Sequence, residues 1–66
     1  MHIELLIKQV RQEKGMTLSS LARRSGVSVA HISDIEKEFK SPSLLVMVRL
    51  AKALNVDITE LYRVRW

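Results

Sequence analysis

The chain has 66 residues, enough for a single domain spanning residues 1–66, and a domain of this size is only marginally stable alone. It has no cysteine, so neither a disulfide nor a thiolate metal site can stabilise it, and no apolar run reaches the length of a membrane span. Hydrophobic residues make up 47% of the sequence, no signal peptide is evident and the net charge is +4, so we expect a globular cytoplasmic protein whose charge favours an anionic partner such as nucleic acid.

The first predicted element is a helix over residues 3–14, ended by Gly15. Its inward face is predicted from apolar residues that recur at helical spacing, namely Ile3, Leu6, Ile7 and Val10.

The next stretch, residues 17–37, holds two short helical patterns joined by a tight turn. Thr17 and Ser28 are suitable N-caps for the two helices. Gly26, between them, can take the positive φ that a sharp turn requires. Two short helices around a glycine-containing turn are the helix-turn-helix layout, in which the second helix can enter the major groove of DNA.

A fourth helix is expected over residues 44–54, after Pro42 has kept Ser41 out of the helical region. Ser43 can cap its start and Asn55 can end it. Because its side chains are apolar nearly all round, it should be buried on more than one side, and a second subunit is the expected cover. Its predicted core face is made by Leu44, Met47, Val48, Leu50, Ala51 and Leu54, and Leu45 and Val46 extend the apolar surface beyond it.

A fifth helix is expected to begin after Asp57, which forms an Asp version of the capping box with Glu60. Leu61 and Tyr62 are expected to face inward. The predicted fold class is therefore all-α, with five short helices packed around one core.

The tail, residues 62–66, alternates apolar and basic side chains. This pattern fits a continued helix, an extended arm that crosses to a partner subunit, or a frayed end. In an extended conformation Tyr62, Val64 and Trp66 would share one side of the strand.

Several segments, in this order and spacing, carry a resemblance to a known family: L-A-R-R-S-G-V-S with I-S-D-I-E, then S-P-S-L, L-A-K-A-L-N-V and D-I-T-E-L-Y. From Ile3 to Tyr62 the chain resembles the Cro and phage-repressor type of helix-turn-helix domain, also called lambda-repressor-like or XRE-type. The resemblance implies a sequence-specific DNA-binding transcriptional regulator. We expect a repressor that acts as a homodimer on a near-palindromic operator in double-stranded DNA, with no cofactor and no small-molecule effector.

The resemblance also implies roles for particular residues. Base-reading positions are Val29, Ala30, Ser33 and Asp34, with His31 at their edge. Phosphate-contacting positions are Thr17, Ser28, Lys37, Lys40 and Ser41. Arg11 is expected to form a partly buried ion pair with Glu36. The dimer surface is predicted instead from the apolar residues outside the core face, and it is expected to include Leu45, Val46, the region of the fourth and fifth helices and Trp66.

The base-reading chemistry departs from the pattern of the family. Val29 and Ala30 offer only apolar contact, suited to a thymine methyl, and Asp34 can accept from a cytosine amino group. Few hydrogen bonds would therefore read the sequence, and DNA shape and ordered water would carry more of the discrimination. Leu18 also stands where the family often has Gln, and Glu38 and Phe39 stand where it often has Gly and a basic residue.

These departures support an alternative function, a protein-interaction module or an antitoxin-type partner that uses the same fold. Leu18, Val29 and Phe39 would form its apolar contact surface. An enzyme is not predicted, because no nucleophile has an organised base. Metal binding is not predicted either, because His2 and His31 lack further ligands.

Overall fold

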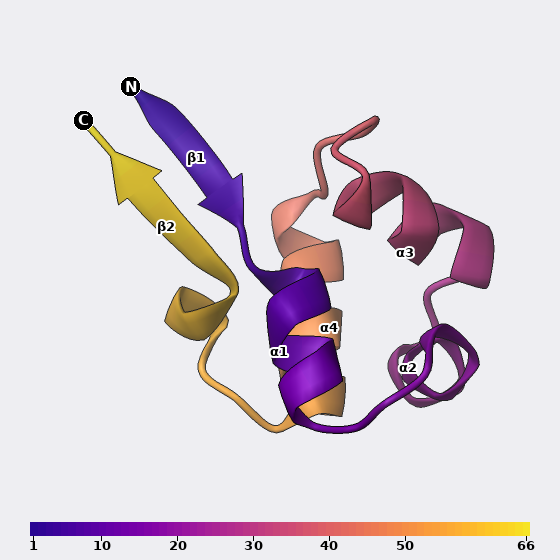
Figure 1. Ribbon diagram of the computed structural model, residues 1–66. Coiled ribbons are helices and arrows are strands. Elements are labelled where there is room, and N and C mark those ends of the chain that lie inside the picture. The colour runs from indigo at the N-terminus through magenta and orange to yellow at the C-terminus, as the bar shows by residue number, and fades with distance from the viewer.

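The computed structural model describes all 66 residues and contains four α-helices, a short 3₁₀ helix and a two-stranded antiparallel sheet (Figure 1). The predicted α-helices in the middle of the chain are confirmed, whereas the prediction of five helices is wrong at both ends. No helix is long and apolar enough to cross a membrane. In chain order the elements are β1 (His2–Leu5), α1 (Ile7–Glu13), α2 (Leu18–Ser25), α3 (Val29–Glu36), α4 (Leu44–Leu54), η1 (Ile58–Leu61) and β2 (Tyr62–Arg65).

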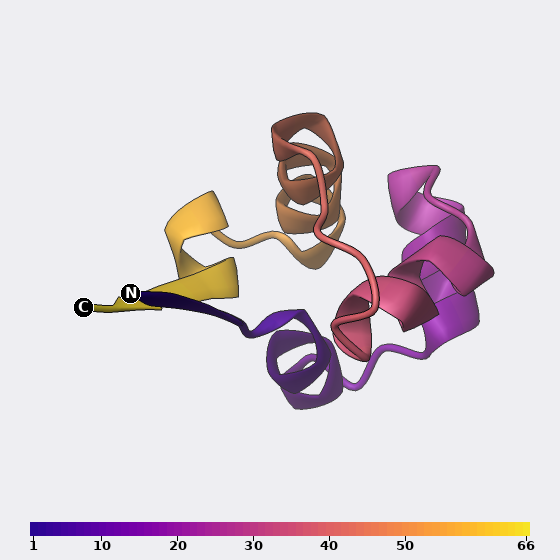
Figure 2. The same ribbon diagram turned by 90° about the horizontal axis from the view of Figure 1, so that it is seen from above.

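The two ends of the chain lie side by side as a β-ribbon, with β1 antiparallel to β2 (Figures 1 and 2). His2 pairs with Arg65 and Leu5 pairs with Tyr62. On the polar face Glu4 accepts from Arg65 Nη2 at 3.2 Å and lies 3.6 Å from Arg63 Nη1. The tail is therefore an extended strand that pairs within its own chain.

The predicted start of the first helix at Ile3 is wrong, because α1 begins at Ile7. The spacing of the apolar residues in this segment fits a helix, but residues 2–5 also alternate polar and apolar, as a strand does. The complementary strand lies at the other end of the chain, so local spacing could not reveal it. Ile3, expected in the core, is 50% exposed, and Tyr62, also expected to face inward, is 36% exposed.

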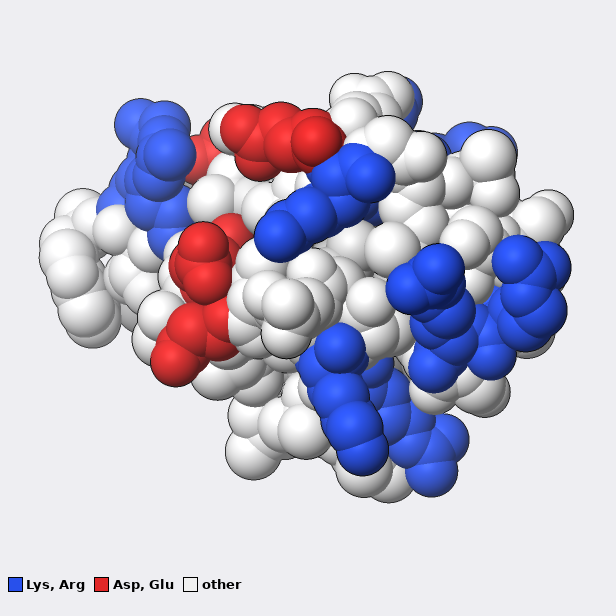
Figure 3. Space-filling model, turned by 90° about the horizontal axis from the view of Figure 1, so that it is seen from below, with Lys and Arg blue, Asp and Glu red and all other residues white.

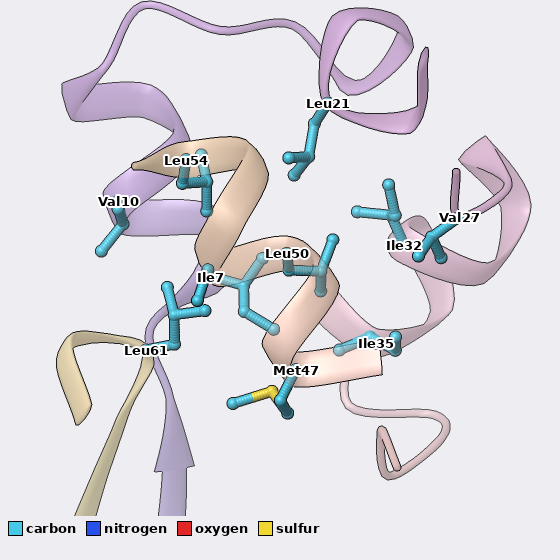
Figure 4. Close-up of a cluster of buried hydrophobic side chains, with 11 residues drawn as sticks. Ile7, Val10, Leu21, Val27, Ile32, Ile35, Met47, Leu50, Leu54 and Leu61 are labelled. Carbon is cyan, nitrogen blue, oxygen red and sulfur yellow. The ribbon is translucent and has the colours of Figure 1, made fainter. Parts of the chain in front are cut away.

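The core is a single cluster of buried apolar side chains around α4 (Figure 4). Leu50 and Leu54 of α4 are almost fully buried, and α4 packs against α1, α2 and η1. The members of the cluster are Ile7, Val10, Leu21, Val27, Ile32, Ile35, Met47, Leu50, Ala51, Leu54 and Leu61.

The predicted core face of α4 is too wide. Leu44 is 74% exposed and Val48 is 49% exposed, whereas Met47 and Leu50 are buried. The neighbouring elements of the same chain cover only one stripe of α4. The apolar residues on its other side therefore face outward in the single subunit.

The ends of α4 and the start of η1 follow the predicted capping. Ser43 Oγ accepts from the Val46 N–H at 3.1 Å, and Asn55 ends α4 at a φ of 57°. The Asp57 carboxylate accepts from the N–H of Thr59 at 2.9 Å and from its hydroxyl at 2.8 Å. These bonds to Thr59 lower the pKa of Asp57, so this cap is complete above the ordinary carboxyl range and is lost as the pH falls through the lowered pKa.

Candidate nucleic-acid interface

The helix-turn-helix is built from α2, a three-residue connection (residues 26–28) and α3. Thr17 caps α2 by accepting from the Ser20 N–H at 3.0 Å, and Gly26 ends it with a φ of 75°. The Ser25 hydroxyl then accepts from the Val27 N–H at 3.1 Å and holds the turn. Since Val27 is buried, the turn itself is anchored in the core.

Helix α3 is fixed at its start by a cap and along its inner face by core packing. Ser28 Oγ accepts from the His31 N–H at 3.1 Å. Ile32 and Ile35 are fully buried, on the side of α3 that faces α4 (Figure 4). The opposite face of α3 is therefore presented to solvent in one orientation.

The candidate base-reading residues lie on this outer side of α3, with unequal exposure. Val29, at 42%, and Ala30 are exposed, whereas His31, Ser33 and Asp34 are half-buried. The most accessible part of the helix is thus its N-terminal turn, which carries apolar side chains. In helix-turn-helix domains the N-terminal residues of this helix meet the edges of the bases.

The candidate phosphate-contacting residues all lie on the surface. Thr17 and Ser28 stand at helix N-termini, where free N–H groups and the positive end of the helix dipole favour an anion. Lys37, Lys40 and Ser41 follow α3 and are exposed. This set supplies both neutral donors and positive charge.

An ion pair between a candidate phosphate-contacting residue and a candidate base-reading residue could not be predicted from the sequence. Lys40 Nζ lies 3.8 Å from Asp34 Oδ2, and 65% of the Lys40 side chain and 36% of the Asp34 side chain are exposed. The two residues are six positions apart, which is not a pair spacing on a helix. The chain reverses after α3, with the Phe39 N–H donating to the Asp34 carbonyl at 2.9 Å, and this reversal brings the two side chains together.

The reversal after α3 places Glu38 in the left-handed region, with a φ of 61°. Glu38 is the residue that replaces the Gly often found here in the resembled family. A residue with a Cβ pays about 1–2 kcal/mol for this conformation. The departure from the family pattern therefore falls at a position where the backbone favours glycine.

Replacing Glu38 with Gly is expected to stabilise the domain by about 0.5–1 kcal/mol, the relief of the strain less the extra entropy of glycine in the unfolded chain. The midpoint of urea unfolding measures the gain. Asn55 is the matched control: it also has a positive φ, of 57°, but Asn tolerates this region, so Asn55→Gly should gain less. Equal gains at the two positions would contradict the argument.

Phe39 and Leu18, the other two departures, differ in their surroundings. Phe39 is 73% exposed, whereas Leu18 is half-buried and packs against the core. Leu18 thus has a structural role in holding α2. The exposed apolar surface available for the alternative function, protein interaction, therefore consists mainly of Phe39 and Val29.

Arg11 of α1 and Glu36 at the end of α3 meet through two hydrogen bonds. Arg11 Nε donates to Glu36 Oε2 at 2.8 Å and Nη2 donates to Oε1 at 3.0 Å. Arg11 Nη1 also donates to the carbonyl of Met16 at 3.0 Å. Only 11% and 6% of the two side chains are exposed. Hydrogen bonding to Glu36 raises the pKa of Arg11 despite its desolvation, so the arginine stays charged and ties α3 to α1.

The candidate dimer residues also differ in exposure. Leu45 is 60% exposed and Trp66 is 94% exposed, whereas Val46 is half-buried and packs against the core of its own chain. Leu44 and Val48 add to the exposed apolar surface of α4. Their outward position could not be read from a helix that is apolar nearly all round.

Comparison with known proteins agrees with this architecture. A family model described as "Helix-turn-helix" matches residues 7–61. The chain is 42% identical over 53 residues to the HTH-type transcriptional regulator SutR of Escherichia coli (strain K12), covering 80% of this chain and 30% of SutR. It is 38% identical over 53 residues to the HTH-type transcriptional regulator SinR of Bacillus subtilis (strain 168), covering 79% of this chain and 48% of SinR. The chain thus spans less than half the length of either relative.

The fold of this chain is similar to that of a solved structure over most of the length of both chains. The crystal structure of the restriction-modification controller protein C.AhdI from Aeromonas hydrophila matches with a TM-score of 0.80 at 28% sequence identity, over 82% of each chain. The family match runs from the start of α1 to the end of η1, so it includes the capped helices and the turn described above. The chain therefore belongs to the XRE (Cro/C1-type) helix-turn-helix family, a non-enzymatic family of DNA-binding transcriptional regulators.

Proposed function

We propose that this protein binds double-stranded DNA as a homodimer, places α3 in the major groove of a near-palindromic operator and represses transcription by occupying a promoter. The observation that carries the proposal is the presentation of α3: its inner face is locked by Ile32 and Ile35, its end is tied to Arg11, and its outer N-terminal turn is exposed. The names of SutR and SinR, both transcriptional regulators, support it.

Sequence reading by this surface would depend on shape and apolar contact. Val29 and Ala30, the most accessible residues of α3, suit thymine methyl groups. The Ser33 hydroxyl can donate a hydrogen bond to a base edge or accept one from it, and the Asp34 carboxylate can accept from a cytosine amino group. Thr17, Ser28, Lys37, Lys40 and Ser41 would set the register on the phosphate backbone.

Asp34 is expected to limit the affinity for DNA, since its carboxylate lies near the phosphates and holds Lys40. The variant Asp34→Asn removes one negative charge and frees Lys40, so binding to a duplex of random sequence should tighten by about fivefold, the equivalent of roughly 1 kcal/mol. The slope of log affinity against log salt should change by less than about 0.9, because Lys40 is proposed to contact a phosphate in the unchanged protein already. Fluorescence anisotropy across a KCl series measures both. An affinity equal to that of the unchanged protein would contradict the expected repulsion by Asp34.

The second subunit is proposed to cover the outer side of α4, where Leu45 and its neighbours are exposed, together with Trp66. The variant Leu45→Glu should weaken self-association by at least about tenfold, because it places a charge in an apolar interface. Sedimentation equilibrium measures the dimer constant. Phe39→Glu is the matched control, since Phe39 is equally apolar and 73% exposed but lies outside the proposed surface. Equal weakening by both variants would contradict the assignment.

The experiment that tests the proposed function is selection from a pool of random duplex DNA, followed by sequencing of the retained molecules. A dimer predicts an inverted repeat with half-site centres about 34 Å, one helical turn, apart. Retention without sequence preference would reduce the function to backbone binding. No retention would overturn the proposal and favour the protein-interaction function, with Phe39 and Val29 as its exposed apolar residues.

A further inference from the structure

A groove between α2 and α4 is lined mainly by basic residues that the proposed DNA-binding function does not use. It has a volume of about 460 Å³ and is lined by Arg24, Ser25, Arg49, Lys52 and Ala53. Arg23, which precedes Arg24 on α2, is also exposed. We call this feature, with Arg23 included, the α2–α4 basic groove.

The charges of the α2–α4 basic groove are not neutralised within the chain. The ion pairs of the molecule join Arg11 to Glu36, Lys40 to Asp34, and Arg63 and Arg65 to Glu4, and none involves a residue of the groove. Figure 3 shows Lys and Arg side chains gathered over α2 and α4 in the lower and right-hand parts of the face, with the Asp and Glu side chains to the left and above. The groove is therefore a region of uncompensated positive charge, which attracts an anionic partner.

Stabilisation of helix ends explains only part of this arrangement. Arg23 and Arg24 stand in the last turn of α2 and Lys52 in the last turn of α4, where positive charge interacts well with the helix dipole. Arg49, however, lies in the middle of α4, and the dipole acts only within the terminal turn. The helix dipole therefore does not explain why Arg49 lines the groove.

The groove is separate from the surface proposed to bind DNA. At 1.5 Å per residue, Arg24 lies roughly 10 Å along α2 from its N-cap Thr17. Arg49 and Lys52 lie roughly 9 and 14 Å along α4 from its N-cap Ser43. The proposed phosphate contacts lie at the N-termini of α2 and α3 and in the turn after α3, whereas the groove is lined by residues from the end of α2 and from the second half of α4. A duplex bound by α3 would therefore leave the groove accessible to another partner; this inference rests on the proposed function.

The shape of the groove favours carboxylates on flexible side chains over a second duplex. Of its lining residues, Ser25 and Ala53 are small and half-buried, whereas Arg24, Arg49 and Lys52 are exposed. A convex duplex cannot enter a space of this size, but the side chains of a short peptide can. The planar guanidinium groups of the two arginines match carboxylates through paired hydrogen bonds. We propose that the α2–α4 basic groove docks an acidic segment of a partner protein, while α3 remains free for DNA.

Fluorescein-labelled hexaglutamate, compared with labelled hexaglutamine, tests the proposal by anisotropy at physiological salt. The full chain should bind the first peptide and not the second. Arg24→Gln combined with Arg49→Gln should weaken hexaglutamate binding by at least about tenfold, because two charge-assisted contacts are lost. The matched control is Lys8→Gln with Lys14→Gln, exposed lysines on or next to α1 with the same change in net charge, and it should weaken binding by less than about twofold.

Three results would overturn the proposal. The first is that the unchanged protein does not bind hexaglutamate. The second is that both double variants lose the same amount of hexaglutamate affinity. The third is that a 20-base-pair random duplex displaces the peptide and that binding of this duplex also depends on Arg24 and Arg49. The melting temperature of each variant shows that it is folded. The proposed DNA-binding function is tested independently of the groove. The Arg24→Gln, Arg49→Gln protein should still select an operator from random duplex DNA, even if the groove binds no peptide.

Discussion

The variant Arg11→Met is expected to lose about 3–5 kcal/mol of unfolding free energy, because it leaves the Glu36 carboxylate buried without a partner. The pair is 11% and 6% exposed and is joined by two hydrogen bonds, so water cannot readily replace the guanidinium. The carbonyl of Met16 loses its side-chain donor in the same change. A chain of this size is stable by only about 3–10 kcal/mol, so much of the variant would be unfolded at physiological temperature.

Urea unfolding followed by circular dichroism measures this loss. Arg65→Met is the matched control, because its ion pair with Glu4 leaves 60% and 36% of the side chains exposed and should contribute less than about 1 kcal/mol. The double variant Arg11→Met, Glu36→Leu should recover more than half of the loss, since it removes both buried charges. An unfolding midpoint for Arg11→Met equal to that of the unchanged protein would show that the pair is not structural.

Reversing the two lysines after α3 is expected to weaken DNA binding by about a hundredfold, or roughly 2.7 kcal/mol. In the variant Lys37→Glu, Lys40→Glu two proposed phosphate contacts are lost and two repulsive charges replace them. The slope of log affinity against log salt should become shallower by about 1.8, since each neutralised phosphate contributes about −0.9. Both lysines are exposed, so the fold should be unaffected.

Anisotropy of a labelled duplex over a KCl series measures this prediction. The control Lys8→Glu, Lys14→Glu makes the same change in net charge on α1 and at its end, at residues that are not among the proposed phosphate contacts. It should weaken binding by less than about tenfold, through the screened long-range field only. Equal weakening by both variants would mean that net charge, and not the position of Lys37 and Lys40, governs binding.

The helix-turn-helix itself could be predicted from sequence because its signals are local. The N-caps Thr17 and Ser28 and the turn glycine Gly26 act within a few residues of themselves, through hydrogen bonds and backbone conformations that residue type determines. The caps Ser43 and Asn55 bound α4 in the same way. The spacing of Ile32 and Ile35 likewise placed the inner face of α3 correctly.

The contacts around the candidate site were only partly predictable. The pairing of Arg11 with Glu36 was expected from the family resemblance, because no local rule joins residues 25 positions apart. The contact of Lys40 with Asp34 depends on the chain reversal at Glu38, whose positive φ a glutamate does not suggest. The basic groove needs α2 and α4 to pack together, so its members are scattered in the sequence.

The sequence by itself determined the central helices of this protein, their caps and the turn between α2 and α3. Only the tertiary structure decided the ends of the chain and the exposed side of α4. His2–Leu5 forms a strand because Tyr62–Arg65 lies beside it, and its apolar residues fit a helical stripe equally well. Leu44 and Val48 are exposed because no other element of the chain reaches that side. The physical reason is range: a cap or a turn acts on its own neighbours, whereas burial and strand pairing depend on residues that only folding brings together.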